Sequence, residues 1–79
     1  MNVLEYEMID ILKRLKDEYG VFEIKAEYEN EGSRQEELCR LKDITSKIDL
    51  PIIMKIGGVE AVTDMYNAIT LGVKGIVAP

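Results

Sequence analysis

The first hydrophobic pattern along the chain is helical. Between Asn2 and Tyr19 apolar residues recur every three or four positions, and charged residues fall mainly between them. The apolar positions are Leu4, Met8, Ile11, Leu12, Leu15 and Tyr19. This spacing predicts an amphipathic helix with one face to bury. Gly20 follows the last periodic residue, so we expect it to end the helix in the left-handed conformation.

The next segment, residues 21–29, alternates instead. Phe22, Ile24, Ala26 and Tyr28 fall on one side, whereas Val21, Glu23, Lys25, Glu27 and Glu29 fall on the other. A period of two is typical of a β-strand, and the charged side predicts one face in contact with water.

A second helix is predicted after Gly32. Ser33 and Glu36 have the spacing of a capping box, which favours Ser33 as the N-cap. The helix is expected to run to about Ile48, because the residue before Pro51 resists helical geometry. Its inward face is expected to consist of Leu38, Leu41, Ile44, Thr45 and Ile48.

The stretch 51–61 organises the remainder of the chain. Residues 51–56 are mostly apolar and too few for a typical helix, which predicts a buried strand with Lys55 near its end. Gly57 and Gly58 then lead into a helix predicted from Val59 to Leu71. Val62, Met65, Tyr66 and Ile69 share one face of that helix, Ala61 and Ala68 permit close approach to a sheet, and Gly72 follows as a cap. Residues 75–79 are expected to form a third short apolar strand.

Helices and strands therefore alternate, in the order α-β-α-β-α-β. Such alternation through short connections predicts parallel strands and an α/β fold. A parallel sheet is expected to be covered on both faces, and three helices do not suffice for that. We therefore expect residues 1–79 to be a single incomplete α/β domain, the N-terminal portion of a TIM (β/α)8 barrel whose remainder is absent after Pro79.

Composition narrows the classes of function. Fifteen acidic and ten basic residues give a net charge of −5, which disfavours nucleic acid and anionic membranes as partners. With a single cysteine, Cys39, and no apolar run of membrane-spanning length, we expect a cytoplasmic protein. Cys39 is expected to be a small packing residue on a helix and not a nucleophile, because the chain has no histidine to activate it. Acid–base chemistry would fall to carboxylates, lysine or tyrosine.

Three charged residues are candidates for chemistry. In a barrel, Lys25 and Glu27 on the first strand and Lys55 on the second would face the lumen near the carboxyl ends of the strands. Such a cluster could hold an anionic substrate, move a proton or polarise a carbonyl group. The alternative is that these are ordinary charges on the wet face of a sheet, or a structural ion pair.

Two further features allow a functional and a plain interpretation. Gly57 and Gly58 could present backbone N–H groups to phosphate or carboxylate at a helix N-terminus, or could simply make a tight turn. Glu27, Glu29 and Glu31 could supply oxygen ligands to a divalent cation, or could be solvated loop charges.

Taken together, three segments resemble a known family. The runs Ile24–Glu29, Pro51–Gly58 and Leu71–Pro79 resemble the HpcH/HpaI aldolase and citrate lyase family of phosphoenolpyruvate/pyruvate-type barrels. Glu27 matches a glutamate of the family's early strand motif, Tyr28 stands where the family has histidine, and Lys55 stands near the family's substrate-binding arginine. Lysine keeps the charge of that arginine but loses its bidentate fork.

The resemblance implies a metal-dependent carbon–carbon lyase or aldolase that acts on a 2-keto acid or citrate-like substrate through a pyruvate enolate. In that case Lys55 would bind a carboxylate or stabilise the enolate, Glu27 would orient a water or base, and Lys25 would tune both. The divalent metal, Mg²⁺ or Mn²⁺, would be held by ligands outside this chain, so we expect the 79 residues alone to be inactive. A non-catalytic anion-binding module and an assembly fragment are the alternatives, and a homo-oligomer or association with the missing part of the barrel is expected.

Overall fold

The computed structural model describes residues 1–28, 33–58 and 61–78. Helices and strands alternate along the chain in the predicted order, and the elements are α1 (Val3–Tyr19), β1 (Ile24–Glu27), α2 (Gln35–Ser46), β2 (Ile52–Lys55), α3 (Val62–Leu71) and β3 (Gly75–Val77). None of the described helices is both long enough and apolar enough to cross a membrane.

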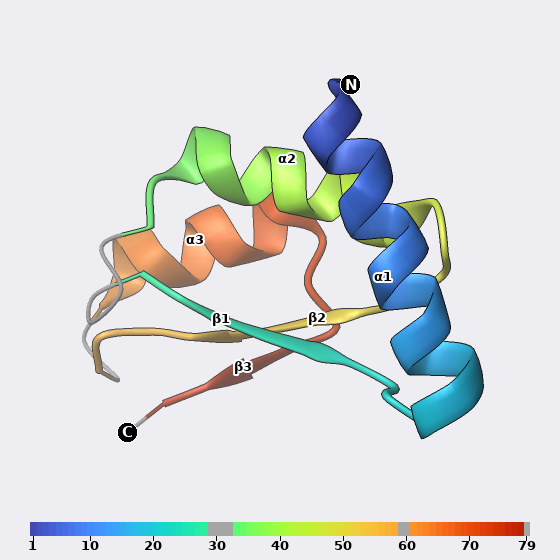
Figure 1. Cartoon of the computed structure of the whole chain (residues 1–79). Helices are drawn as coiled ribbons and strands as arrows, with labels where there is room; N and C mark the ends of the chain where they lie inside the picture. Colours follow the sequence, from blue (N-terminus) through green and yellow to red (C-terminus); the bar gives the residue numbers. More distant parts are fainter. Residues whose placement is uncertain (29–32, 59–60, 79) are drawn as a thin grey trace.

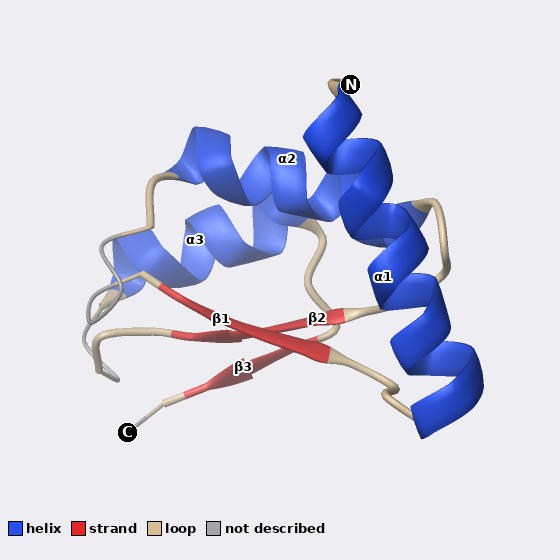
Figure 2. Ribbon diagram, viewed as in Figure 1, coloured by secondary structure: helices blue, strands red, loops and turns tan. Residues whose placement is uncertain are grey.

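The described strands form a parallel sheet in the order β1-β2-β3. Ile24 pairs with Ile52 at the start of the β1–β2 ladder, and Glu27 pairs with Lys55 at its end. All three helices lie on the same face of the sheet, with α2 between α1 and α3 (Figures 1 and 2). The predicted α/β class with parallel strands is confirmed, whereas membership of a barrel stays a prediction.

The first helix ends at Gly20 as predicted, and it begins at Val3, one residue after the start of the predicted pattern. At its start the Asn2 side chain accepts a hydrogen bond from the Glu5 N–H (2.8 Å), and the Glu5 carboxylate accepts one from the Asn2 N–H (3.2 Å). This reciprocal pair satisfies two backbone donors that have no partner inside the helix. At its end Gly20 has a φ of 75°, a left-handed conformation that glycine adopts without a Cβ clash.

The second helix starts later than expected. Its N-cap is Arg34, and the Glu37 carboxylate accepts hydrogen bonds from the Arg34 N–H (3.3 Å) and Nε (3.0 Å). The prediction of Ser33 as N-cap, with Glu36 as its partner, is therefore wrong by one position. The inward face is as predicted: Leu38, Ile44 and Thr45 are buried, and Leu41 and Ile48 are half-buried.

The third helix begins at Val62, and the expected start at Val59 lies outside the described residues. Its buried side is formed by Ala68 and Leu71, and the small Ala68 permits the predicted close approach to the sheet. Val62, Tyr66 and Ile69 share the predicted common face, but that face is exposed. Gly72 ends the helix with a φ of 85°, as predicted.

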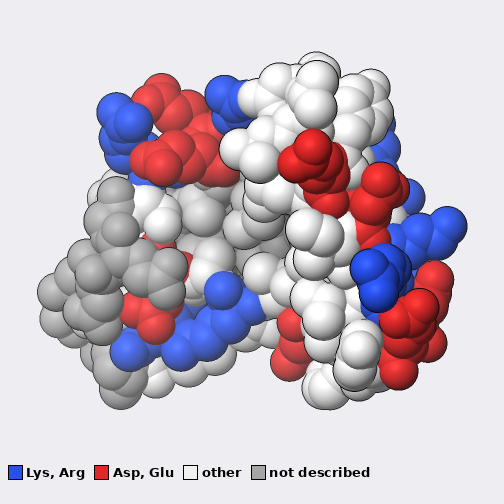
Figure 3. Space-filling view, in the orientation of Figure 1, with Lys and Arg blue, Asp and Glu red and all other residues white. Residues whose placement is uncertain are grey.

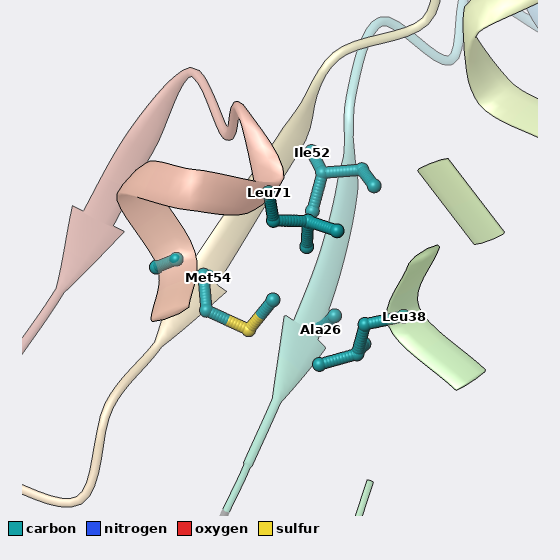
Figure 4. Packing of buried hydrophobic residues seen from close by; sticks show 6 residues of the cluster. Ala26, Leu38, Ile52, Met54 and Leu71 are labelled. Atoms are coloured by element: carbon teal, nitrogen blue, oxygen red, sulfur yellow. The ribbon is translucent and has the colours of Figure 1, made fainter. Parts of the chain in front are cut away.

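The core lies between the sheet and the helix layer. Its buried cluster consists of Ala26, Leu38, Ile52, Met54, Ala68 and Leu71 (Figure 4). These residues come from β1, β2, α2 and α3, so the two crossover helices and the sheet bury one another's apolar faces. Phe22 was predicted to face the helices. That prediction is wrong, because the Phe22 side chain is 71% exposed. Pairing of β1 begins only at Ile24, whose N–H donates to the Pro51 carbonyl, so Phe22 precedes the covered part of the strand.

Polar contacts join the helices to one another and to the loops. Glu5 of α1 is buried and forms an ion pair with Arg40 of α2, with an Oε1–Nη2 distance of 2.6 Å. The hydrogen bonds from Arg40 hold the pKa of the Glu5 carboxyl below its ordinary value. Lys16 Nζ donates to the Ile48 carbonyl (2.8 Å), beside Asp49, whose φ of 55° turns the chain toward β2.

Candidate functional site

The face of the sheet opposite the helices carries the predicted charged residues. Because Ile52 and Met54 are buried against the helices, the alternating residues Ile53 and Lys55 point to the other face. The parallel register sets Lys25 beside Ile53 and Glu27 beside Lys55. The structure therefore brings Lys25, Glu27 and Lys55 together on one surface, which we call the open face.

Lys25 and Glu27 form an ion pair on this face. The Nζ–Oε1 distance is 3.2 Å, and the side chain of Lys25 is 57% exposed whereas that of Glu27 is only 14% exposed. Such a half-exposed pair adds little to stability because water screens it. Its consequence is local: it compensates the charge of a largely buried carboxylate.

Lys55 occupies a different position in the cluster. It lies at the carboxyl end of β2, between Glu27 on β1 and Val77 on β3, and it is half-buried. Among the described residues its ammonium group has no hydrogen-bond or ion-pair partner within bonding distance. A half-buried lysine without such a partner retains three N–H donors for an external acceptor.

A polar network ties the elements together at the same edge of the sheet. The Tyr28 hydroxyl donates to Gln35 Oε1 (2.9 Å), and Gln35 Nε2 donates to the Asn67 carbonyl (3.0 Å), which links the end of β1 to α2 and α3. Burial, reinforced by the negative charge of Asp64, raises the pKa of Tyr28 above its ordinary value. Tyr28 therefore remains a protonated phenol at neutral pH, on the helix side of the sheet and away from Glu27.

The backbone groups of Gly57 and Gly58, which precede α3, form hydrogen bonds with other residues of the chain. The Gly57 N–H donates to Asp64 Oδ2 (3.1 Å), and the Gly58 carbonyl accepts from the Ala61 N–H (3.0 Å). A carboxylate of the protein itself thus takes the position that an external anion would need at Gly57. Anion binding at Gly57 and Gly58 stays a prediction, and the plain interpretation of a strand-to-helix turn agrees with these bonds.

Asp64 and Gln35 were missed by the sequence analysis. Asp64 lies in the first turn of α3, where a negative charge is favoured by the helix dipole, and this position after a glycine pair was the available signal. Gln35 gives no comparable signal, because its contacts with Tyr28 and Asn67 depend on how three elements pack.

The described residues do not assemble a metal site. Within 1–28, 33–58 and 61–78 no three His, Cys, Asp or Glu side chains lie close enough together to hold a metal ion. Glu27 belongs to the predicted acidic cluster, but Glu29 and Glu31 lie outside the described residues. Cys39 is exposed on α2, so its prediction as a packing residue is wrong.

Charge of one sign does not dominate the surface seen in Figure 3. Basic and acidic side chains alternate there, and the N-terminal part of α1 is largely uncharged.

A separate cavity of about 420 Å³ lies at the amino edge of the sheet, where its lining includes Lys42 and Lys74. Lys42 Nζ is already bonded to the Gly72 carbonyl at the end of α3 (3.0 Å), so this lysine holds a helix terminus.

Comparison with known proteins adds no further constraint. No protein-family model, no curated protein and no solved structure matches the chain.

Proposed function

We propose that the open face binds the carboxylate of a small 2-keto acid and forms one wall of the active site of an aldolase-type carbon–carbon lyase. The observation that carries this proposal is the position of Lys55. Its ammonium group, which has no bonded partner among residues 1–28, 33–58 and 61–78, lies at the carboxyl end of the central strand, in register with a charge-compensated glutamate. The carboxyl edge of a parallel sheet is where ligands bind in α/β proteins.

The three charged residues have distinct roles in this proposal. The Lys55 ammonium donates hydrogen bonds to the substrate carboxylate or to the oxygen that gains charge as an enolate forms. Glu27 accepts a proton or orients a water molecule, and Lys25, whose Nζ lies 3.2 Å from Glu27 Oε1, compensates its charge. Lys25 acts through Glu27, so its removal should alter the position of that carboxylate more than the affinity for substrate.

The arrangement of the sheet supports a barrel as the setting. Strands that follow one another in the order β1-β2-β3, with all helices on one face, are arranged as in a (β/α) barrel, whereas doubly wound sheets carry helices on both faces. The lumen of such a barrel would be the open face. The resemblance of the strand segments to the HpcH/HpaI aldolase and citrate lyase family points the same way.

A divalent metal is part of what that resemblance implies, and the described residues do not fit one. If Mg²⁺ or Mn²⁺ takes part, its ligands come from outside these residues, and the metal would polarise the substrate carbonyl. The contribution proposed for this chain is limited to binding the carboxylate and placing Glu27.

Titration of the chain with pyruvate tests the proposal. We expect saturable chemical-shift changes in ¹H–¹⁵N spectra at Lys55 and Glu27, and a loss of affinity of about tenfold or more in Lys55→Ala, because a hydrogen bond to a charged group contributes roughly 1.5–3 kcal/mol. Lys13→Ala, which removes an exposed lysine of α1, is the matched control and should bind as the wild type does.

Two results would contradict the proposal. Equal affinity of Lys55→Ala and the wild type would remove Lys55 from the site. Tighter binding of inorganic phosphate than of pyruvate, with shifts centred on Gly57, would favour the phosphate-binding alternative. We expect weak phosphate binding, because Asp64 already accepts the Gly57 N–H.

A further inference from the structure

The two ends of β1 are held to β2 by backbone bonds of different length. At the amino end the Ile24 N–H donates to the Pro51 carbonyl at 2.9 Å. At the carboxyl end the Tyr28 N–H donates to the Lys55 carbonyl at 3.5 Å. Most N–H···O bonds in proteins measure roughly 2.7–3.2 Å, so the second bond is a weak one. The position of Glu27 opposite Lys55 therefore needs a further contact at this end of the strand.

The Tyr28 side chain supplies that contact on the helix side of the sheet. Its ring packs against the buried core cluster, and its hydroxyl donates to Gln35 Oε1 at 2.9 Å. Gln35 is the first residue of α2, and its Nε2 donates at 3.0 Å to the carbonyl of Asn67 in α3. The end of β1 is thereby tied to α2 and, through Gln35, to α3.

The amide of Gln35 suits this place because it carries both an acceptor and a donor. Its oxygen accepts from the Tyr28 hydroxyl, and its NH₂ group donates to the Asn67 carbonyl, which can only accept. An amide turned the other way would set its oxygen against that carbonyl. The Asn67 carbonyl therefore keeps the amide oxygen directed toward Tyr28.

We propose that Gln35 is a positioning residue of the open face, which acts through Tyr28 to hold Glu27 opposite Lys55. Successive side chains of a strand point to opposite faces, so fixing Tyr28 on the helix side fixes the direction of the Glu27 side chain on the open face. Gln35 and Tyr28 themselves lie away from that face and touch no ligand in this proposal. The inference rests on the proposed function for the ligand that Glu27 and Lys55 bind, whereas the anchoring of β1 does not depend on it.

Amide hydrogen exchange of the 79-residue chain, followed by NMR, tests the anchoring. In Tyr28→Phe the amide of residue 28 should exchange roughly 2–10-fold faster than in the wild type, the size expected for the loss of one neutral hydrogen bond. The amide of Ile24 should be unchanged, because it lies at the other end of the strand. Gln35→Met removes the same bond and should act alike, and adding Tyr28→Phe to it should have little further effect.

Tyr6→Phe is the matched control. It also removes one tyrosine hydroxyl, but from a side chain on α1 that is 60% exposed. Exchange at residue 28 should be the same in Tyr6→Phe as in the wild type.

Titration with pyruvate tests the consequence for the open face. The dissociation constant should rise roughly 2–10-fold in Tyr28→Phe and in Gln35→Met, because each loses the bond that holds the end of β1. Tyr6→Phe should bind pyruvate as the wild type does.

Three outcomes would overturn the positioning role. Unchanged exchange at residue 28 would show that Gln35 does not hold β1, and equal acceleration at residues 24 and 28 would show that it supports the whole fold instead. Unchanged pyruvate affinity in both variants would show that the strand end does not place the site. A wild type without affinity for pyruvate would contradict the proposed function, and exchange at residue 28 would still decide whether Gln35 holds the end of β1.

Discussion

The two faces of the sheet are built by the same short strands and have opposite characters. On β2, Ile52 and Met54 are buried beneath α2 and α3, whereas Ile53 and Lys55 on the other side are only half-buried. Because successive side chains of a strand point to opposite faces, the residues of one face can stabilise the fold while those of the other remain available for chemistry. The role of a charged residue in a strand therefore depends on whether its side chain points to the face covered by helices or to the uncovered face.

The strongest test of this difference is the removal of a core side chain. Met54→Ala should lower the free energy of unfolding by about 2–5 kcal/mol, a large part of the roughly 4–12 kcal/mol expected for a chain of this length. Urea denaturation measures the loss. Ile53→Ala, one residue away on the open face, should cost less than half as much, and equal losses would mean that the open face is covered in solution.

A smaller effect is expected from the ion pair that holds α1 against α2. The pKa of Glu5 is lowered in the fold by Arg40, so its contribution to stability is fully present above the unfolded value near pH 4.3 and is lost as the pH falls through the lowered folded value. Denaturation of wild type and Glu5→Gln should therefore show a difference that shrinks below about pH 4.

Glu18→Gln is the control for that experiment. Glu18 faces Arg14 in an exposed pair at 3.8 Å, which is expected to contribute little. A Glu5→Gln difference that persists unchanged to pH 2 would show that the charge of Glu5 does not contribute to holding the helix layer together.

The smallest effect is expected on the open face itself. A Cβ added at Gly75 would lie 3.3 Å from Ile53 Cδ1, the far end of a flexible side chain that is free to shift where no helix covers it. Gly75→Ala should change the free energy of unfolding by no more than about 0.5 kcal/mol. A loss above about 1 kcal/mol, measured by urea denaturation, would show that this face is tightly packed.

Periodicity predicted the elements and the faces of the strands well, because both follow from residue spacing. It placed Ala26, Ile52 and Met54 under the helices and Lys25, Glu27 and Lys55 opposite them. The start of α2 was missed by one residue. Ser33–Glu36 and Arg34–Glu37 have the same spacing, and the choice between them depends on contacts that the Arg34 side chain makes.

Burial of single side chains was harder to predict. The apolar face of α3 is exposed because the helix rests on Ala68 and Leu71 instead, and the exposure of Cys39 depends on which side of α2 faces the sheet. The role of Asp64 needed the turn at Gly57 to be known. Each of these depends on how elements pack, which residue spacing alone does not specify.

The central position of β2 has a consequence for the way the molecule opens. Its backbone is bonded to a neighbour on both sides, whereas β1 and β3 each have one neighbour among the described strands. Either outer strand can lose its hydrogen bonds while the other two strands remain paired. β2 becomes unpaired only after the hydrogen bonds to both β1 and β3 are broken. Because Lys55 is paired with Glu27 on β1 and with Val77 on β3, its backbone keeps one neighbouring strand when the other detaches.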